Sequence, residues 1–458
     1  MPKSTVLRAE FAEISSSRKD WSEAAKRWQE ILDELGETAN ENVYVRLSVA
    51  LAKVGDFEKA NQTAQRGLKS LSNNVAVHVA YARVAIEGRD WSEAAKRWQE
   101  ILDEFSAKLS PQVLATAASS YRRAGKLKKA GEVVAAALEK YGREPQLLIE
   151  QAEITNAQRH WQKSIKRWQT ALHELEEIPA PTNSDILLCR FNISVLKRLI
   201  NIKSYKKEVA DYQKSTSSVK SHADRIVIYT AVSKGYDDLK LPEKIDPNFD
   251  YVCFTDDPSI DGFGVYDIRP FPVASSDPAR TIRYPKTHPH VLFSDYALAI
   301  WLDTSIMITG DINHLIKTFK ESGLPLGTTP HPVRVSLDEE YMACVNLMKD
   351  DPEIMRRQIE TYKKEGFEVS SFAENGVLLF NLQSKRLQKA LDTWWEQIQK
   401  FSKRDQLSFG YSMEKWDIKW YPISARPNNI RNHPDFVIAP HQAEQDILKQ
   451  LYKLLKAG

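Results

Sequence analysis

Apolar residues recur at helical spacing through the first half of the chain. In DWSEAAKRWQEILDE, residues 20–34, the side chains of Trp21, Ala24 and Trp28 fall on one face of a helix, because residues three or four apart on a helix are neighbours. Apolar stretches alternate with segments of this kind, at 43–54, 75–86, 111–124 and 146–157. The pattern predicts pairs of helices that each bury one face.

The segment at residues 20–34 occurs twice in the chain. Residues 90–104 repeat residues 20–34 letter for letter, and HWQKSIKRWQTALHE from His160 is a weaker copy. Related segments begin midway between the copies, at Gly55 and Gly125, so the underlying period is about 35 residues. A recurring sequence of this length predicts that each unit makes the same contacts with its neighbours, and the identity of the two copies indicates a recent duplication.

The repeated residues suit helices that pack closely on one another. Small residues occupy one position of successive segments, and glycines stand where a helix would end. In period, small positions and aromatic positions, residues 5–215 resemble the tetratricopeptide repeat family, with five recognisable units and a decayed sixth at 185–214. The small residues are Ala24, Ala60, Ala94 and Ala130, and the glycines are Gly55, Gly88 and Gly125.

Six tryptophans of the repeats have two interpretations. They are core residues of the helix pairs, or they line an aromatic binding groove on the concave face of the array. The resemblance implies a scaffold that binds a protein partner or self-associates, and this half contains no catalytic pattern. The tryptophans are Trp21, Trp28, Trp91, Trp98, Trp161 and Trp168.

The second half of the chain has a different pattern. Short β-branched runs at 225–232, 249–257, 296–308 and 374–382 predict strands, and amphipathic stretches between them predict helices at 311–322, 352–366 and 384–401. This alternation predicts a Rossmann-type α/β domain, whose ligands bind at the carboxyl ends of its strands. The predicted organisation is an all-α solenoid at 5–215, a polar linker at 216–224, the α/β domain at 225–440 and a C-terminal helix at 441–458.

Composition narrows the class of protein. The chain has 458 residues with 64 basic and 61 acidic side chains, and its first half lacks the basic stripe of a protein that binds a nucleic acid polymer. Cys189, Cys253 and Cys344 are far apart, so neither a disulfide framework nor a cysteine metal site is expected. The start has no apolar leader, and no stretch approaches eighteen apolar residues. We expect a soluble cytoplasmic protein.

Six motifs in the second half occur in one order. Over 225–437 they resemble the glycosyltransferase-like domain shared by bacterial polysaccharide-biosynthesis proteins and plant mucilage and pectin-related proteins. The resemblance implies a GT-A-like fold, a nucleotide-sugar donor and a glycan acceptor. The motifs are YTAVSKGYDDL, DYVCFTDD, ARTIRYPKTHPHVLF, IWLDTSI, ENGVLLFNL and KRDQLSFGYSMEKW.

The resemblance also implies where the donor binds. The end of the first strand, with Thr230, Ala231 and Tyr236, would cradle the nucleotide, and Asp256 or Asp257 would bind the base or the ribose. A charged turn after a strand is the alternative interpretation of the two aspartates.

A cluster of cations precedes the W-L-D motif. Arg280, Arg283, Lys286 and His290 are spaced by three, three and four residues, which would align them on a helix, although Pro285 makes one continuous helix doubtful. Fixed positive charges suit a diphosphate leaving group. The alternative is a solvated basic face.

Asp303 is the residue expected to hold a metal ion. GT-A enzymes close a strand with D-x-D and bind a divalent cation there, whereas this chain reads Asp303-Thr304-Ser305. Mn²⁺ or Mg²⁺ can bind through one carboxylate together with phosphate oxygens and water, and His433 is the candidate for a second protein ligand. A metal-independent enzyme, in which the basic cluster replaces the ion, is the alternative.

Two further carboxylates are candidates for chemistry at the acceptor. Glu374 and Asp405 could each act as general base in an inverting displacement or shield a cationic sugar in a retaining one. Gln406 could bind sugar hydroxyls. Asp405 also stands at a predicted helix start, where a helix N-cap is the simpler role.

The last residues of the chain form an amphipathic pattern with lysines on the polar side. It suits packing on the α/β domain or a second subunit, or contact with an anionic membrane surface. The apolar residues are Ile447, Leu448, Leu451, Leu454 and Leu455.

Three functions are compatible with these observations. The leading hypothesis is a cytoplasmic glycosyltransferase of surface polysaccharide biosynthesis, of the capsule or lipopolysaccharide type. The second is a protein-modifying glycosyltransferase whose repeats select the substrate. The third is a non-catalytic repeat scaffold with a degenerate transferase domain, which the missing D-x-D carboxylate favours.

Overall fold

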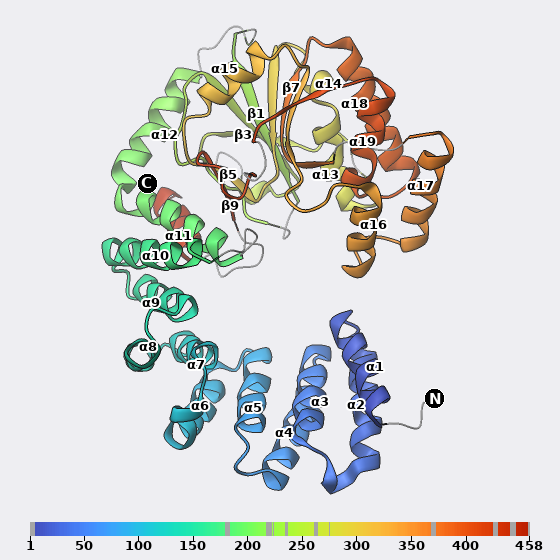
Figure 1. Cartoon of the computed structure of the whole chain (residues 1–458). Helices are drawn as coiled ribbons and strands as arrows, with labels where there is room; N and C mark the ends of the chain where they lie inside the picture. Colours follow the sequence, from blue (N-terminus) through green and yellow to red (C-terminus); the bar gives the residue numbers. More distant parts are fainter. Residues whose placement is uncertain are drawn as a thin grey trace. The chain divides into compact units, whose positions relative to one another are not determined.

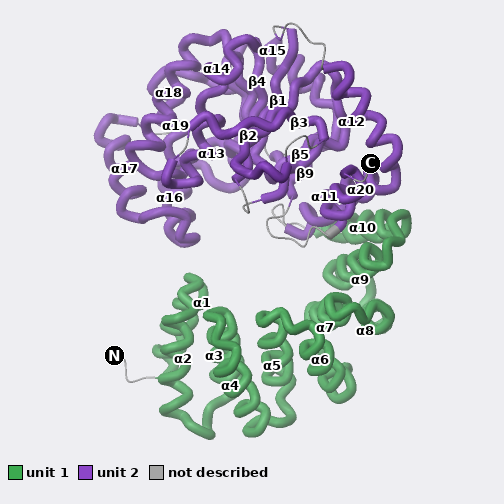
Figure 2. Tube along the Cα trace, turned by 180° about the vertical axis from the view of Figure 1, so that it is seen from behind, with its two compact units in different colours: residues 1–178 green, residues 179–458 purple. Residues whose placement is uncertain are grey.

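The computed structural model divides the chain into two compact units, Met1–Ile178 and Pro179–Gly458 (Figure 2). It describes residues 5–178, 184–216, 222, 224–233, 237–260, 264–273, 275–367, 372–424, 429–439 and 446–456. The two units are described separately below.

The first unit consists of consecutive helices, as the repeat pattern predicts (Figure 1). Each of the helices from α1 to α10 packs against the next one in the chain. Short 3₁₀ turns, Gly36–Thr38 and Ser106–Lys108, follow α2 and α6. The helices are α1 Thr5–Ser17, α2 Trp21–Leu35, α3 Glu41–Val54, α4 Phe57–Ser70, α5 Val75–Glu87, α6 Trp91–Phe105, α7 Pro111–Arg123, α8 Leu127–Tyr141, α9 Pro145–Ala157 and α10 Trp161–Glu176.

Local sequence sets the ends of these helices. The Asp20 and Asp90 carboxylates accept hydrogen bonds from the amides three residues on, at 3.1 and 3.0 Å, which caps α2 and α6. Gly55 ends α3 at a φ of 94°, as expected of a glycine cap. Gly88 also ends its helix, α5, as predicted, although its φ is −74° and the left-handed conformation falls on Arg89.

The core of the first unit is made of the predicted tryptophans and small residues. Trp28 is 3% exposed, and Trp98 and Trp168 are completely buried. Trp21, Trp91 and Trp161 at the helix starts are half-buried. The four alanines singled out in the sequence, Ala24, Ala60, Ala94 and Ala130, are all fully buried. The core interpretation is therefore confirmed for the second tryptophan of each repeat.

Helices α11 (Ser184–Ile200) and α12 (Ile202–Thr216) lie in the second unit, although the sequence analysis assigned them to the solenoid. Their polar side chains bond to the α/β domain: Arg198 donates to the Leu241 carbonyl at 2.7 Å, and Tyr212 to that of Phe249 at 3.1 Å. The compact units thus divide after Ile178, upstream of the predicted linker, because these two helices pack on the core of the domain.

The second unit is built on a seven-stranded sheet in the order β3-β2-β1-β4-β7-β6-β8. Its pairs are parallel except those of β7, which runs antiparallel to both β4 and β6. A second sheet pairs β5 with β9. The strands are β1 Ile226–Val232, β2 Phe249–Thr255, β3 Tyr266–Pro270, β4 Leu298–Leu302, β5 Ile306–Ile308, β6 Leu326–Pro330, β7 Ala373–Asn381, β8 Trp420–Pro422 and β9 Phe436–Ile438.

Helices cover both faces of the large sheet. One apolar core joins it to α13, α18 and α19, and the other joins it to α12, α15, α20 and the small sheet. A short 3₁₀ turn, Pro258–Ile260, follows β2. The helices are α13 Pro278–Thr287, α14 Pro289–Leu292, α15 Asn313–Glu321, α16 Leu337–Asn346, α17 Pro352–Lys364, α18 Lys385–Lys400, α19 Asp405–Lys415 and α20 Asp446–Lys456. The predicted α/β class is confirmed.

Two interruptions in the second half agree with the sequence, which predicts a break of the 296–308 run at Asp303 and makes one continuous helix over the cation segment doubtful. The run at 296–308 forms two strands, β4 and β5, separated at Asp303. The cation segment forms two helices, with Pro285 inside α13 and Pro289 at the start of α14, where a proline needs no amide hydrogen bond. The C-terminal helix packs by its apolar face, since Ile447, Leu448 and Leu451 are buried.

The strand order fixes where a ligand can bind. The chain leaves β1 toward β2 and β3, then returns to place β4 on the other side of β1. Ligands of such sheets bind at the carboxyl ends of the strands where this reversal occurs. The crevice beside β1 is therefore the candidate site.

Candidate donor-binding and catalytic site

Two aspartates flank β1 at the carboxyl edge of the sheet. Val232 at the end of β1 pairs with Thr255 at the end of β2, so Asp256 leaves β2 beside Ser233. On the other side, Tyr229 pairs with Trp301, and β4 ends just before Asp303. Two strand spacings separate these positions, which corresponds to about 10 Å.

Asp303 is held firmly and remains accessible. Its amide donates to the Gly376 carbonyl at 2.9 Å, and its Oδ1 accepts hydrogen bonds from Trp301 Nε1 at 2.8 Å and Lys286 Nζ at 3.2 Å. The side chain is 45% exposed. Among the described residues, no hydrogen-bond donor reaches Oδ2. One carboxylate oxygen is thus oriented by the protein, while the side chain as a whole stays accessible.

Gly376 leaves room for the Ile306 side chain beside this carboxylate. A Cβ at that position would lie 2.9 Å from Ile306 Cδ1 and 3.6 Å from Asp303 Oδ2. A larger residue would push on the turn that carries Asp303.

The predicted cation segment reaches Asp303 through Lys286. This side chain is only 4% exposed, and its ammonium lies 2.8 Å from Asp405 Oδ2 in addition to its contact with Asp303. Arg283 Nε approaches Asp405 Oδ1 at 3.2 Å. The structure therefore brings together Asp303, Lys286, Asp405 and Arg283 in one ionic chain.

Asp405 anchors this chain. Burial by itself would raise the pKa of Asp405, but Lys286, Arg283 and Arg404 outweigh burial and hold that pKa well below its ordinary value. A carboxylate with so low a pKa accepts a proton poorly, and Lys286 and Arg283 engage both of its oxygens. Its geometry suits positioning the two cations better than acting as general base. The N-cap of α19 is Arg404, one residue before Asp405.

Three other predicted donor ligands make contacts away from Asp303. Arg280 donates to the carbonyls of Ile398 and Phe401 at 3.1 and 2.9 Å, which ties α13 to the end of α18. His290 Nε2 contacts Asp392 at 3.0 Å. Gln406 Nε2 donates to the Ala373 carbonyl at 3.1 Å, just before Glu374. Arg280 is thus used to join helices.

Glu374 is also paired. Both of its oxygens accept hydrogen bonds from the Arg431 guanidinium at 2.7 Å, and its side chain is 17% exposed. To act as a base it would first have to leave this bidentate contact.

His433 and Asp303 are not brought together. Ala439 bonds to Ser305 at one end of the β5–β9 pair, and Asp435 bonds to Thr309 at the other. His433 precedes Asp435, so about 13 Å of strand separates its end of the pair from the end near Asp303. Within the described part of the chain, no group of three His, Cys, Asp or Glu residues could hold a metal ion. The residues fit a cation held by Asp303 alone with substrate phosphates and water.

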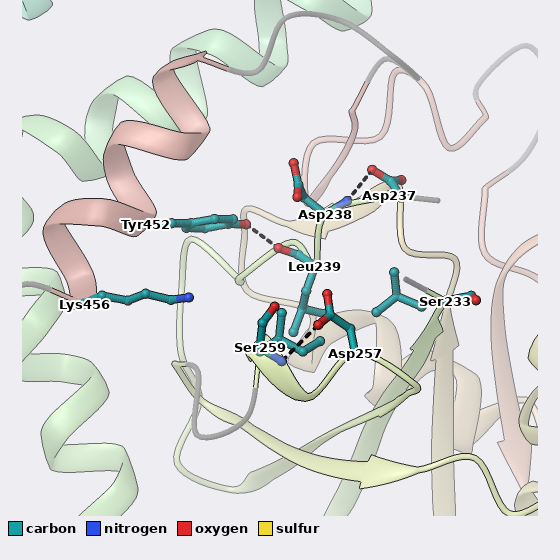
Figure 3. A pocket seen from close by; sticks show the side chains of 10 residues that line it. Ser233, Asp237, Asp238, Leu239, Asp257, Ser259, Tyr452 and Lys456 are labelled. Atoms are coloured by element: carbon teal, nitrogen blue, oxygen red, sulfur yellow. Dashed lines mark hydrogen bonds between the residues drawn. The ribbon is translucent and has the colours of Figure 1, made fainter. Parts of the chain in front are cut away.

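A cavity of about 190 Å³ lies at the ends of β1 and β2 (Figure 3). The contacts around it are polar: Asp257 Oδ1 accepts a hydrogen bond from the Ser259 amide at 2.9 Å, and Asp237 Oδ1 accepts one from Lys240 Nζ at 2.7 Å. Its lining consists of Val232, Ser233, Asp237, Asp238, Leu239, Asp257, Ser259, Ile260, Tyr452 and Lys456.

Some of the residues predicted to bind the nucleotide lie at this cavity. Asp257 lines it, and Asp256 accepts a hydrogen bond from the lining residue Ser233 at 3.0 Å. Thr230 and Ala231 are buried in β1 and support it from within the sheet. Tyr236 lies outside the described residues. Sequence reasoning missed Tyr452 and Lys456, although their spacing of four on a predicted helix was a usable signal.

Comparison with known proteins agrees with this architecture. Residues 268–425 match the family described as "TOD1/MUCI70, glycosyltransferase-like domain". That range includes the ionic chain of Asp303, Lys286, Asp405 and Arg283, and it excludes β1 and β2. No curated protein matches the chain.

Solved structures match over the helical repeats. The MamA fragment 41-end from Desulfovibrio magneticus RS-1 is 13% identical, covering 39% of this chain and 99% of that one with a TM-score of 0.33. A tetratricopeptide repeat protein from Parabacteroides merdae ATCC 43184 is 14% identical, with 48% and 95% covered and a TM-score of 0.35.

The chain thus has a first unit of consecutive packed helices and a second unit in which residues 268–425 are similar to the TOD1/MUCI70 glycosyltransferase-like domain. None of the described helices is both long and apolar enough to span a membrane.

Proposed function

We propose that the second unit is a glycosyltransferase that moves a sugar from a nucleoside diphosphate sugar to a glycan acceptor. The observation that carries this proposal is the accessible Asp303 carboxylate, fixed by Lys286, Trp301 and Gly376 at the carboxyl end of β4. The glycosyltransferase-like match over 268–425 supports the reaction class.

In this proposal the donor lies along the carboxyl edge of the sheet. Its nucleoside occupies the cavity at β1 and β2, and its diphosphate extends toward Asp303. A divalent cation bound at Asp303 would offset the charge that develops on the leaving diphosphate. Lys286 and Arg283 add fixed positive charge at the same place, and Asp405 keeps both oriented.

Acceptor and pathway follow from the family resemblance. We propose a glycan acceptor in surface polysaccharide biosynthesis, with the repeats docking a protein partner or a second copy of the chain. Glu374 stays a candidate for contact with the acceptor, because it lies at the start of β7 on the same edge of the sheet as Asp303.

The test uses the full chain and a panel of nucleoside diphosphate sugars, with Mn²⁺ or Mg²⁺ and without either. We expect turnover of at least one donor, reduced at least a hundredfold in Asp303→Asn. Asp338→Asn is the matched control, because Asp338 pairs with Lys363 on the exposed surface of the same unit. Turnover that survives Asp303→Asn would remove Asp303 from the mechanism.

Metal binding can be measured independently of turnover. Calorimetry with Mn²⁺ and UDP should show cation-dependent binding of the nucleotide in the parent protein. Asp303→Asn should abolish that dependence and leave cation-free binding in place. Equal cation dependence in the two proteins would exclude Asp303 as the ligand.

A further inference from the structure

The last helix of the chain forms one wall of the cavity at β1 and β2. Tyr452 and Lys456 of α20 line it together with the turn that follows β2 (Figure 3). The sequence analysis considered this helix only for packing or membrane contact.

Helix α20 is fixed in place by its apolar face. Ile447 is 4% exposed, Leu448 and Leu451 are completely buried, and the helix packs against α11 and α12. The Tyr452 hydroxyl donates a hydrogen bond to the Leu239 carbonyl, which attaches the helix to the cavity lining. A helix anchored in this way presents its next turn at a defined position.

Lys456 occupies that next turn. Because it follows Tyr452 by four residues, its side chain projects from the same side of the helix. In Figure 3 its ammonium points from α20 toward the turn that carries Asp257 and Ser259. Lys453, in the same last turn of α20, is exposed like Lys456 but does not line the cavity.

The charges of the lining indicate which part of a donor fits. Three aspartates line the cavity, and Asp237 is neutralised by the buried Lys240. Among the described lining residues, Lys456 is the only cation, and Asp238 and Asp257 line the same cavity. Carboxylates accept hydrogen bonds from hydroxyl and amino groups and repel phosphate, so the lining suits a ribose and a base.

The volume of the cavity limits how much of a donor it can enclose. Pockets that enclose a drug-sized ligand measure about 300–1,000 Å³. A cavity of about 190 Å³ holds a fragment of a nucleoside diphosphate sugar, with the remainder outside it.

From these contacts we infer that α20 completes a pocket for the nucleoside of the donor. Lys456 binds an oxygen of the base or ribose, and Tyr452 is a positioning residue that holds the helix against Leu239. The inference rests on the proposed function and adds a binding element that lies outside the region matched at 268–425.

The experiment measures binding of UDP, GDP, ADP and CDP, and of the matching monophosphates, to the full chain by calorimetry. For the nucleotide that binds, we expect Lys456→Met to weaken the diphosphate and the monophosphate by the same factor, about tenfold. Lys453→Met removes the same charge from the same helical turn and should change affinity less than twofold. Tyr452→Phe should weaken binding severalfold, and thermal denaturation without ligand checks that the variants are folded.

The outcomes separate the inference from the function on which it rests. If the parent protein binds none of the nucleotides, the donor proposal itself fails. If the parent binds a nucleotide and Lys456→Met binds it equally well, Lys456 has no role in binding and the donor proposal stands. The same holds if Lys456→Met and Lys453→Met lose affinity equally, because the effect would then not depend on the position of the lysine. A loss confined to the diphosphate would also overturn the inference, because Lys456 would then serve the phosphates.

Discussion

The two units of this chain bury charged side chains to different extents. In the described part of the repeat unit, Arg97 and Glu150 are the charged residues buried below a tenth of their surface, and each pairs with an opposite charge. The described part of the second unit buries more: Lys240, Lys286, Glu340 and Asp405, each in contact with an opposite charge, and Arg198, which donates to the Leu241 carbonyl. Two of these, Lys286 and Asp405, belong to the candidate site. Removing one partner of such a pair is costly, so a chain that retains them gains orientation at the site more than stability.

A second comparison lies within the repeats, between the two identical copies. Asp20 and Asp90 make the same cap, because a cap depends only on the next three residues. Arg27 and Arg97 differ. Both pair with the glutamate four residues earlier, Glu23 or Glu93, but the Arg97 side chain is 9% exposed and that of Arg27 is 34% exposed. Only for Arg97 are further hydrogen bonds seen, to Asn61 and the Tyr81 carbonyl, within the described part of the chain. Identical sequences thus share their local structure and differ in their tertiary contacts.

The largest effect is expected from emptying the core of the repeats. Trp98→Ala removes a completely buried ring from the cluster around α5 to α9 and should lower the free energy of unfolding by about 3–5 kcal/mol. Urea denaturation followed by circular dichroism measures this. Nucleotide affinity should be unchanged at a temperature where the variant is folded, and a parallel loss of affinity would contradict the assignment of Trp98 to a purely structural core.

Breaking the ionic chain of Asp303, Lys286, Asp405 and Arg283 should lower the free energy of unfolding by about 3 kcal/mol. Asp405→Asn leaves the buried Lys286 without its closest carboxylate. The pKa of Asp405 is lower in the folded than in the unfolded protein, so its contribution is present above the unfolded value of 3.8 and is lost as the pH falls below it.

The difference in stability between parent and Asp405→Asn should therefore shrink as the pH falls below about 4. Denaturation at several pH values checks the sign. A difference that stays constant down to pH 2 would show that Asp405 does not act through its charge. Asp338→Asn on the exposed surface is the control and should change stability by less than about 0.5 kcal/mol.

The duplicated arginines give a matched pair. Arg97→Met should destabilise the protein by about 1–3 kcal/mol, because it leaves the partly buried acceptors of Asn61 and Tyr81 without this donor. The same substitution at Arg27 should cost less than about 0.5 kcal/mol. Equal losses in chemical denaturation would mean that local sequence, and not the neighbouring repeat, sets the contribution of this arginine.

The smallest loss of stability is expected from removing the N-cap aspartates of α2 and α6. Asp20→Ala and Asp90→Ala should each destabilise their helix by about 1 kcal/mol, and by similar amounts, since each carboxylate accepts one amide hydrogen bond. Amide hydrogen exchange in the first turns of α2 and α6 measures the two losses separately. A difference of more than about 1 kcal/mol between them would show that tertiary contacts reach the caps.

Part of the candidate site could be predicted from sequence and part could not. Asp303 and Lys286 were both singled out, and the structure places their side chains in contact. Arg280, in the same motif, instead binds the carbonyls at the end of α18, 118 and 121 residues away. Motif spacing reports which residues share a helix, but which of them reaches the crevice depends on how that helix packs.

Sequence by itself determined the elements that depend on near neighbours: the helix pairs, their caps, the buried Trp98, and the alternation of strands and helices in the second half. Tertiary structure alone decided the antiparallel direction of β7, the docking of α11 and α12 on the α/β domain, and the presence of Lys456 beside Asp257. The physical reason is the distance along the sequence between the residues that interact. A hydrogen bond within one turn is encoded in three or four residues, whereas a pocket joins side chains that are some two hundred positions apart and are held together only by the core between them.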